Sequence, residues 1–331
     1  MSKLTTEVVQ GDARAIARMI RRADDRAPGF REELRELLPH TGRAQIIGVT
    51  GNPGVGKSTL VDRLIEAYRS RGKRVGVVAV DPSSPLTGGA ILGDRIRMQR
   101  HALDDGVFIR SLATRGHLGG LSRSATDVAR VLDAAGFDVI LIETVGVGQD
   151  EVEITRAVHT TVLVVAPGLG DEVQAIKAGI LEIADLFVVN KADRDGADAT
   201  ARDLDAMLSL RSEPAFAGSH SLAHAHKEPV PERGPGSTAG WSPPVLRTVA
   251  SGGEGIGELL EAVESHRLHL AGTQDGQARL RRRAEEELLS AVRERLTERA
   301  QDLVAGCLPE LVDRIVERRT DPYDAAAELV P

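Results

Sequence analysis

Short runs of apolar and β-branched residues recur along the middle of the chain, separated by longer stretches with helical spacing. Several runs are apolar throughout, as expected for strands that are covered on both faces. Strands that alternate with helices are typical of parallel βα units with right-handed crossovers. We therefore expect an α/β fold in which a mostly parallel twisted sheet is flanked by helices. The predicted strands occupy residues 45–50, 74–80, 107–112, 138–143, 161–166, 186–190 and 245–249.

Helical patterns flank this region on both sides and divide the chain into three parts. Residues 1–42 predict an N-terminal helical segment, in which Asp12 caps a helix with one apolar face. Residues 43–270 form the predicted α/β domain, and residues 271–331 predict a C-terminal helical segment. The last segment has an apolar stripe that either packs on its own domain or pairs with a second copy. This stripe begins with Leu288, Val292 and Leu296.

The segment GVTGNPGVGKST at residues 48–59 follows the first predicted strand and precedes a helical pattern. It fits the phosphate-binding loop G-x-x-x-x-G-K-[ST], whose glycines let backbone N–H groups converge on phosphate oxygens. Lys57 is expected to bridge the β- and γ-phosphates, and Ser58 to ligate Mg²⁺. The fold is therefore predicted to be that of a P-loop NTPase. The expected phosphate-binding residues are Gly51, Asn52, Pro53, Gly54, Val55, Gly56, Lys57, Ser58 and Thr59.

A second motif, Asn190-Lys191-Ala192-Asp193, ends the sixth predicted strand and indicates guanine recognition. The carboxylate of Asp193 can accept hydrogen bonds from guanine N1–H and the 2-amino group, which adenine does not offer. A mismatched buried polar group costs about 1–3 kcal/mol, so GTP is favoured over ATP. Lys191 is expected to lie along the base, and Asn190 to tie this loop to the phosphate loop. A further base-contacting loop is Val249-Ala250-Ser251, where the Ala250 N–H is expected to donate to guanine O6.

Acidic residues between these motifs are candidate magnesium and water ligands. Glu143 ends the fourth predicted strand, where a carboxylate holds Mg²⁺ through water or orients the attacking water, and Gly146 lets a backbone N–H approach the γ-phosphate. Asp81 closes the second strand, and Asp94 follows a glycine-rich segment. Both aspartates are also compatible with ordinary capping or turn formation. The predicted metal set is Ser58, Asp81, Asp94 and Glu143.

Composition narrows the function classes. The net charge of −7 gives no electrostatic support for nucleic-acid binding. The single cysteine, Cys307, excludes an internal disulfide and a Cys-rich metal site. No apolar run is long enough to span a membrane, and the first residues lack a signal-peptide core, so a cytoplasmic enzyme is expected. Residues 212–243 are rich in Pro, Gly, Ser and His and predict a mobile inserted loop rather than a metal site.

The blocks VDPSSPLTGGAILGD (80–94), ETVGVGQDE (143–151) and NKAD (190–193) resemble the MeaB/ArgK-type GTPases, chaperones of cobalamin-dependent acyl-CoA mutases. The resemblance runs through 45–211 and 241–265. It implies a homodimeric GTPase that binds methylmalonyl-CoA mutase or a related mutase and gates adenosylcobalamin delivery and protection.

The same resemblance implies that Asp81, Asp94 and Glu143 arrange Mg²⁺ and the water, and that the C-terminal helices serve dimerisation. It further implies a partner-ordered switch at 168–179, which includes Asp171 and Lys177.

Three alternative functions are weighed beside this one. A nickel-delivery GTPase for hydrogenase or urease maturation would use the His-rich loop, which contains His220, His224 and His226. An ATP-using kinase for transport proteins is disfavoured by the guanine motif. A structural scaffold with a degenerate nucleotide site is disfavoured because Lys57 and Asp193 are both present.

Overall fold

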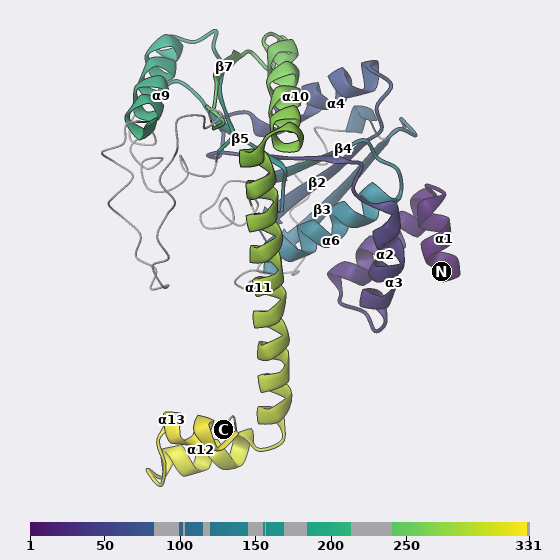
Figure 1. Ribbon diagram of the computed structural model, residues 1–331, viewed down its shortest axis with the longest axis vertical. Coiled ribbons are helices and arrows are strands. Elements are labelled where there is room, and N and C mark those ends of the chain that lie inside the picture. Colours follow the sequence, from purple (N-terminus) through teal and green to yellow (C-terminus); the bar gives the residue numbers. More distant parts are fainter. Residues whose placement is uncertain are drawn as a thin grey trace. The chain divides into compact units, whose positions relative to one another are not determined.

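A parallel sheet forms the centre of the protein in the computed structural model, which describes residues 1–82, 99–101, 103–114, 120–144, 155, 157–168, 184–212 and 240–329 (Figure 1). Within these residues the strand order is β3-β2-β4-β1-β5-β6-β7, and every pairing is parallel. The strands are β1 (Gln45–Thr50), β2 (Val75–Pro82), β3 (Val107–Thr114), β4 (Val139–Thr144), β5 (Thr160–Val165), β6 (Leu186–Asn190) and β7 (Val245–Thr248). All seven predicted strands are confirmed, with ends that differ by at most two residues.

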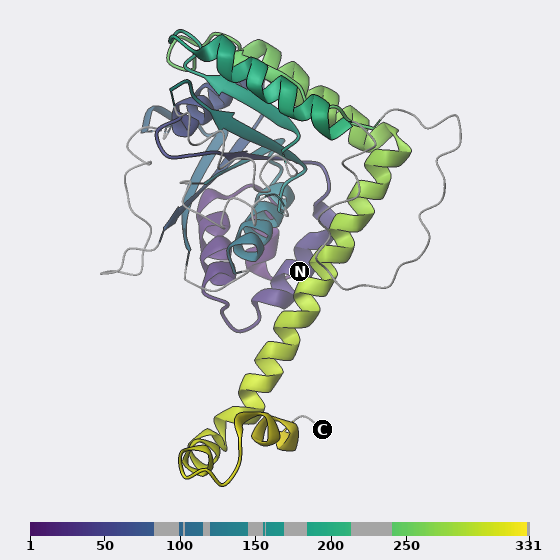
Figure 2. The same ribbon diagram turned by 90° about the vertical axis from the view of Figure 1, so that its left-hand side faces the viewer.

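Helices cover both faces of this sheet, as the two views show (Figures 1 and 2). Alternate residues of each strand point to opposite faces, so Ile47 and Leu141 pack toward one layer, and Ile140 and Ile142 toward the other. The first layer contains α4 (Lys57–Ser70) and α10 (Ile256–Gly272). The second contains α6 (Gly120–Ala134) and α9 (Ala197–Ser212). Burial on both faces explains why these strands are apolar throughout.

The N-terminal helices pack against α6. They are α1 (Lys3–Val9), α2 (Ala13–Asp24), α3 (Phe30–Leu37) and the short η1 (Leu38–His40). The Asp12 carboxylate accepts the Ala15 N–H at 2.7 Å, which confirms the predicted cap of α2. The chain enters β1 through a contact with α6, because Asp133 accepts backbone N–H groups from Gly42 and Ala44 at 2.5 and 2.9 Å. The amino end of β1 is thereby fixed to the second layer.

Two compact units, Met1–Gln277 and Ala278–Pro331, divide the chain, and the sheet belongs to the first. Helix α11 (Gln274–Ala305) leads into α12 (Leu308–Val316) and α13 (Pro322–Leu329). Asp321 caps α13 by accepting the N–H groups of Tyr323 and Asp324 at 2.7 and 2.9 Å. No helix among the described residues has the length and apolar character needed to cross a bilayer.

The predicted mobile loop at 212–243 needs correction at both ends. Ser212 is the last residue of α9. Trp241 is anchored: its Nε1–H donates to the Asp185 carbonyl at 2.8 Å, and its ring lies 4.7 Å from that of the buried His266. The sequence pattern missed this anchor because one aromatic residue in a Pro/Gly-rich stretch shows no period. Residues 213–239, including His220, His224 and His226, lie outside the described residues.

Candidate functional site

The turn between β1 and α4 depends on glycine at two points. Gly51 has a φ of +135°, and a Cβ there would lie 2.1 Å from the Val164 carbonyl oxygen of β5. Gly56 has a φ of +99°, and a Cβ there would lie 2.4 Å from Asn190 Nδ2. A side chain is therefore excluded at each position by backbone conformation and by space. The turn is held closely against the ends of β5 and β6.

Side chains at the start of α4 connect this turn to β4. Lys57 is buried, and its Nζ donates to the carbonyl oxygens of Gly51 and Asn52 at 2.5 and 2.9 Å. The ammonium group therefore lies against the turn and does not extend into solvent. The hydroxyl of Ser58 donates to Glu143 Oε1 at 2.7 Å, and both residues are buried. A cation, a hydroxyl and a carboxylate thus meet at the carboxyl edge of neighbouring strands.

Asn190 joins the phosphate loop to the loop at residues 249–251, called here the base loop. Its Nδ2 donates to the Val55 carbonyl at 2.8 Å, so the predicted tie to the phosphate loop is present. Its Oδ1 accepts from Thr248 Oγ1 and from the Ala250 N–H, each at 3.1 Å. Asn190 is only 2% exposed, which makes these bonds costly to lose. One amide therefore fixes two loops that are separated widely in the sequence.

The predicted donor to guanine O6 has a hydrogen-bond partner within the protein, and its contact with a base stays a prediction. The Ala250 N–H is the donor to Asn190 Oδ1, and Ala250 is buried. Its neighbours Val249 and Ser251 are half-buried and exposed, respectively. The sequence showed that a short loop follows β7, but it did not show that the Asn190 side chain accepts this N–H. The base loop is therefore positioned through Asn190.

Lys191 and Asp193 lie at the mouth of the site. Lys191 has a φ of +58°, and its Nζ donates to the Gly54 carbonyl at 2.6 Å. This contact joins the Lys191 side chain to the phosphate loop. Asp193 is exposed, so its carboxylate is accessible to a ligand. The chain turns here because Arg194 N–H donates to the Lys191 carbonyl at 3.0 Å.

Arg63 of α4 is a site residue that sequence reasoning missed. Its Nε donates to the Ala250 carbonyl at 3.0 Å, and its Nη2 donates to the Ser251 carbonyl at 2.8 Å. The guanidinium therefore holds the outer side of the base loop while Asn190 holds the inner side. No motif signals this role, because Arg63 looks like an ordinary polar position on a helix surface.

Asp62, one residue earlier on α4, anchors the short 3-10 helix η2 (Gln99–His101). Arg100 Nε donates to Asp62 Oδ1 at 2.8 Å, and His101 Nε2 lies 2.8 Å from the same oxygen. This hydrogen bond to Asp62 raises the pKa of Arg100, and the charge of Glu66 adds to the effect. Arg100 and His101 are therefore fixed to the helix that follows the phosphate loop.

Several predicted site residues lie outside the part of the chain that the structure describes. Asp94, Gly146 and residues 169–179 of the predicted switch fall outside the described residues, so Asp171 and Lys177 do as well. The backbone of Asp81 ends β2, paired with Ala113 of β3, and its side chain is not described. These assignments stay predictions.

The donor set at the end of β4 suits a small divalent cation. Ser58 supplies a hydroxyl oxygen and Glu143 a carboxylate oxygen, 2.7 Å apart, and Mg²⁺ prefers such oxygen ligands. Both side chains are buried, so the pair lies inside the protein and not on its surface. Asp81 follows in the adjacent strand β2, whose residue Val80 pairs with Thr144. The residues present therefore fit a magnesium ion.

Comparison with known proteins assigns the chain to a family. Residues 13–304 match the family model described as methylmalonyl-CoA mutase-associated GTPase MeaB. The chain belongs to the MeaB family. A relative from Pyrococcus abyssi is 46% identical over 327 residues, which cover 98% of this chain and 94% of the relative. The GTPase ArgK of Escherichia coli is 36% identical over 293 residues, which cover 85% of this chain and 82% of ArgK.

A solved structure supports the fold assignment of this MeaB-family chain. The crystal structure titled LAO/AO transport system kinase matches with a TM-score of 0.66 and 24% identity, covering 99% of this chain and 95% of that one. At this identity the likeness shows the fold alone. It agrees with the parallel sheet and the helical C-terminal extension described above.

Proposed function

We propose that this MeaB-family chain is a Mg²⁺-dependent, GTP-hydrolysing switch. The observation that carries the proposal is the buried hydrogen-bond network of Asn190, which joins a phosphate loop to a base loop. Such a network would hold a triphosphate site and a purine site at a fixed separation. The coarser assignment to a family of GTPases supports the same activity.

The phosphate half of the site would bind the charged end of GTP. The N–H groups of residues 54–58 and the N-terminus of α4 would offer donors and partial positive charge to phosphate oxygens. Lys57 already lies on this loop and can turn its ammonium from loop carbonyls to the β- and γ-phosphates. The buried position strengthens this attraction because little water screens it.

The base half would select guanine. Asp193 is exposed beside the loop and would accept from guanine N1–H and the 2-amino group. Lys191 would cover one face of the base while its Nζ stays on Gly54. Arg63 and Asn190 would act as positioning residues, because both touch the base loop through hydrogen bonds.

Mg²⁺, when bound, supplies charge that neutralises the phosphate oxygens. Ser58 and Glu143, with Asp81 and Asp94 from the neighbouring segment, are the residues proposed to hold it and to orient the attacking water. In this proposal, GTP orders the segments near Asp94 and Gly146, and loss of the γ-phosphate releases them.

The proposed client is a cobalamin-dependent acyl-CoA mutase of the methylmalonyl-CoA mutase type, for which the chain would gate adenosylcobalamin loading and protect the enzyme. The family description names an association with methylmalonyl-CoA mutase, which supports this choice. The active form is proposed to be a homodimer. Its support is a row of exposed apolar side chains on α11, namely Leu288, Leu289, Val292, Leu296 and Leu303.

The partner proposal is tested by capture of purified methylmalonyl-CoA mutase on the immobilised full-length chain. The chain is loaded with GDP or with a non-hydrolysable GTP analogue, and Lys57→Ala serves as the control that cannot respond to the nucleotide. We expect mutase binding that differs between the two nucleotide states in the native chain and not in the variant. Equal, negligible capture in both states would overturn the mutase as the client.

A further inference from the structure

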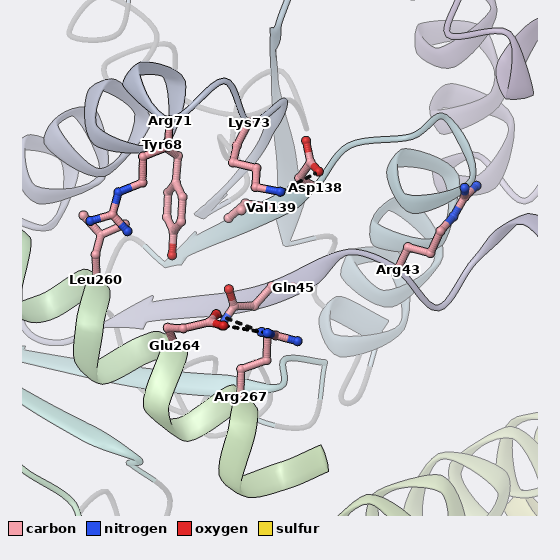
Figure 3. A pocket seen from close by; sticks show the side chains of 10 residues that line it. All are labelled: Arg43, Gln45, Tyr68, Arg71, Lys73, Asp138, Val139, Leu260, Glu264 and Arg267. Atoms are coloured by element: carbon pink, nitrogen blue, oxygen red, sulfur yellow. Dashed lines mark hydrogen bonds and ion pairs between the residues drawn. The ribbon is translucent and has the colours of Figure 1, made fainter. Parts of the chain in front are cut away.

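A pocket of about 390 Å³ lies at the amino edge of the sheet (Figure 3). Gln45 and Val139, the first residues of β1 and β4, line the pocket. At the other end of these strands, Gly51 directly follows β1 and Glu143 is near the end of β4. The pocket and the nucleotide site are therefore at opposite ends of β1 and β4. Its volume falls in the range of about 300–1,000 Å³ that is typical of small-molecule sites.

A tyrosine hydroxyl without a hydrogen-bond partner among the described residues lines this pocket. Tyr68, near the end of α4, is only 7% exposed, and its side chain extends from α4 toward α10 (Figure 3). Among the described residues, no hydrogen bond is made by the Tyr68 hydroxyl. Burial raises the pKa of this phenol well above its usual range, so it remains a donor. The hydroxyl can therefore donate a hydrogen bond to a ligand oxygen in the pocket.

The carboxylates of the pocket are already engaged. Asp138 accepts the Arg74 N–H at 2.8 Å and lies 3.3 Å from Lys73 Nζ. Glu264 accepts two bonds from the Arg267 guanidinium, at 2.8 and 2.5 Å (Figure 3). Neither carboxylate therefore offers a strong site for a cation. The cations that line the pocket outnumber these carboxylates, so its charged groups chiefly donate hydrogen bonds.

A guanidinium lies beside the unpaired hydroxyl. Arg71 follows Tyr68 by three residues, a spacing that brings side chains to one face of a helix. Its guanidinium makes no hydrogen bond to the described part of the chain. The charge of Arg71 acts on both Glu264 and Tyr68. The pKa of Glu264 is lowered by its hydrogen bonds to Arg267, and the charges of Lys73 and Arg71 add to this effect. The charge of Arg71 also opposes the rise in the pKa of Tyr68.

We propose that this pocket binds a small organic phosphate, whose phosphate group accepts hydrogen bonds from Tyr68 and Arg71. Phosphate oxygens accept hydrogen bonds, which matches a pocket whose carboxylates are engaged and whose cations are in excess. The planar guanidinium offers two parallel donors to such a group. The organic part would lie along Gln45 toward Arg43, a second cation at the far side of the pocket (Figure 3).

The test measures phosphate binding while the nucleotide site is filled. Full-length chain saturated with GDP and Mg²⁺ is titrated calorimetrically with ribose 5-phosphate and with inorganic phosphate, with ribose and succinate as comparison ligands. Tyr68→Phe removes only the hydroxyl, and Arg71→Gln removes only the charge. Arg14→Gln, an exposed position on α2, is the control that changes the net charge equally.

We expect saturable binding of both phosphates to the native chain at concentrations up to about 10 mM, whereas ribose does not bind. Each pocket variant should weaken this binding about tenfold or more, and Arg14→Gln should leave it unchanged. GDP affinity and melting temperature should not fall in Tyr68→Phe, because its hydroxyl makes no protein hydrogen bond. The proposal would be overturned by no saturable phosphate binding, by pocket variants that bind phosphate as tightly as the native chain does, or by a preference for succinate.

Discussion

Replacement of Asn190 by alanine tests whether one amide holds the two halves of the nucleotide site together. The substitution removes three hydrogen bonds, to Val55, Thr248 and Ala250, at 2.8, 3.1 and 3.1 Å. At about 1 kcal/mol for each neutral bond, the loss is about 3 kcal/mol. The site is buried, and the Val55 carbonyl and the Ala250 N–H would be left without this partner, which raises the cost further.

The assay pairs urea unfolding with GDP binding, both on the full-length chain. Thr248→Val is the matched control, because it removes a single bond of about 1 kcal/mol from the same network and leaves the link to the phosphate loop. For Asn190→Ala we expect about 3 kcal/mol less stability and GDP binding weakened about 100-fold. If Asn190→Ala lowers both quantities no more than Thr248→Val does, the amide does not join the two loops as described.

Three further predictions concern the loops and one ion pair. Gly51→Ala should lower the free energy of thermal unfolding by about 3 kcal/mol or more, because its Cβ would lie 2.1 Å from a carbonyl oxygen of β5. Gly54→Ala should lower it by only about 1 kcal/mol, because a Cβ there meets nothing within 4 Å. Equal losses in the two variants would contradict this. Arg63→Ala should weaken GDP binding about tenfold with little change in ATP binding, since it frees the base loop, and unchanged GDP titrations would refute that role. The hydrogen bond from Arg69 lowers the pKa of Asp104 in the folded protein. The ion pair therefore stabilises the fold fully above the usual carboxyl pKa of about 4, and this stabilisation is lost as the pH falls through the lowered pKa of the folded state. Unfolding scans between neutral and strongly acid pH should show less acid sensitivity in Asp104→Asn; an unchanged slope would count against the ion pair.

The strands and the phosphate loop could be predicted from the sequence because both are local patterns. A run such as Val139–Ile142 is apolar on both faces since helices cover both faces of the sheet. The tie between Asn190 and the phosphate loop also followed from the motif, because an amide at that strand end has few other partners in a P-loop fold. These inferences need only spacing and the direction of parallel strands.

The remaining features depend on contacts between residues far apart in the sequence. Arg63 meets the carbonyls of Ala250 and Ser251, and no local pattern reports that helix α4 passes the base loop at this point. The engagement of the Ala250 N–H was missed for the same reason. The pocket at the amino edge joins Tyr68 to α10, so it exists only once the two helices pack side by side.

The central claim is that this site binds a guanine nucleotide by its phosphates and its base edge together. Competition between GTP and ATP for the Mg²⁺-supplemented full-length chain, compared with Asp193→Asn, tests it most directly. We expect the native chain to prefer GTP by about 100-fold and the variant to lose most of that preference, since one carboxylate accepts both guanine donors. Equal affinity of the native chain for GTP and ATP, or full GTP preference in the variant, would contradict the account.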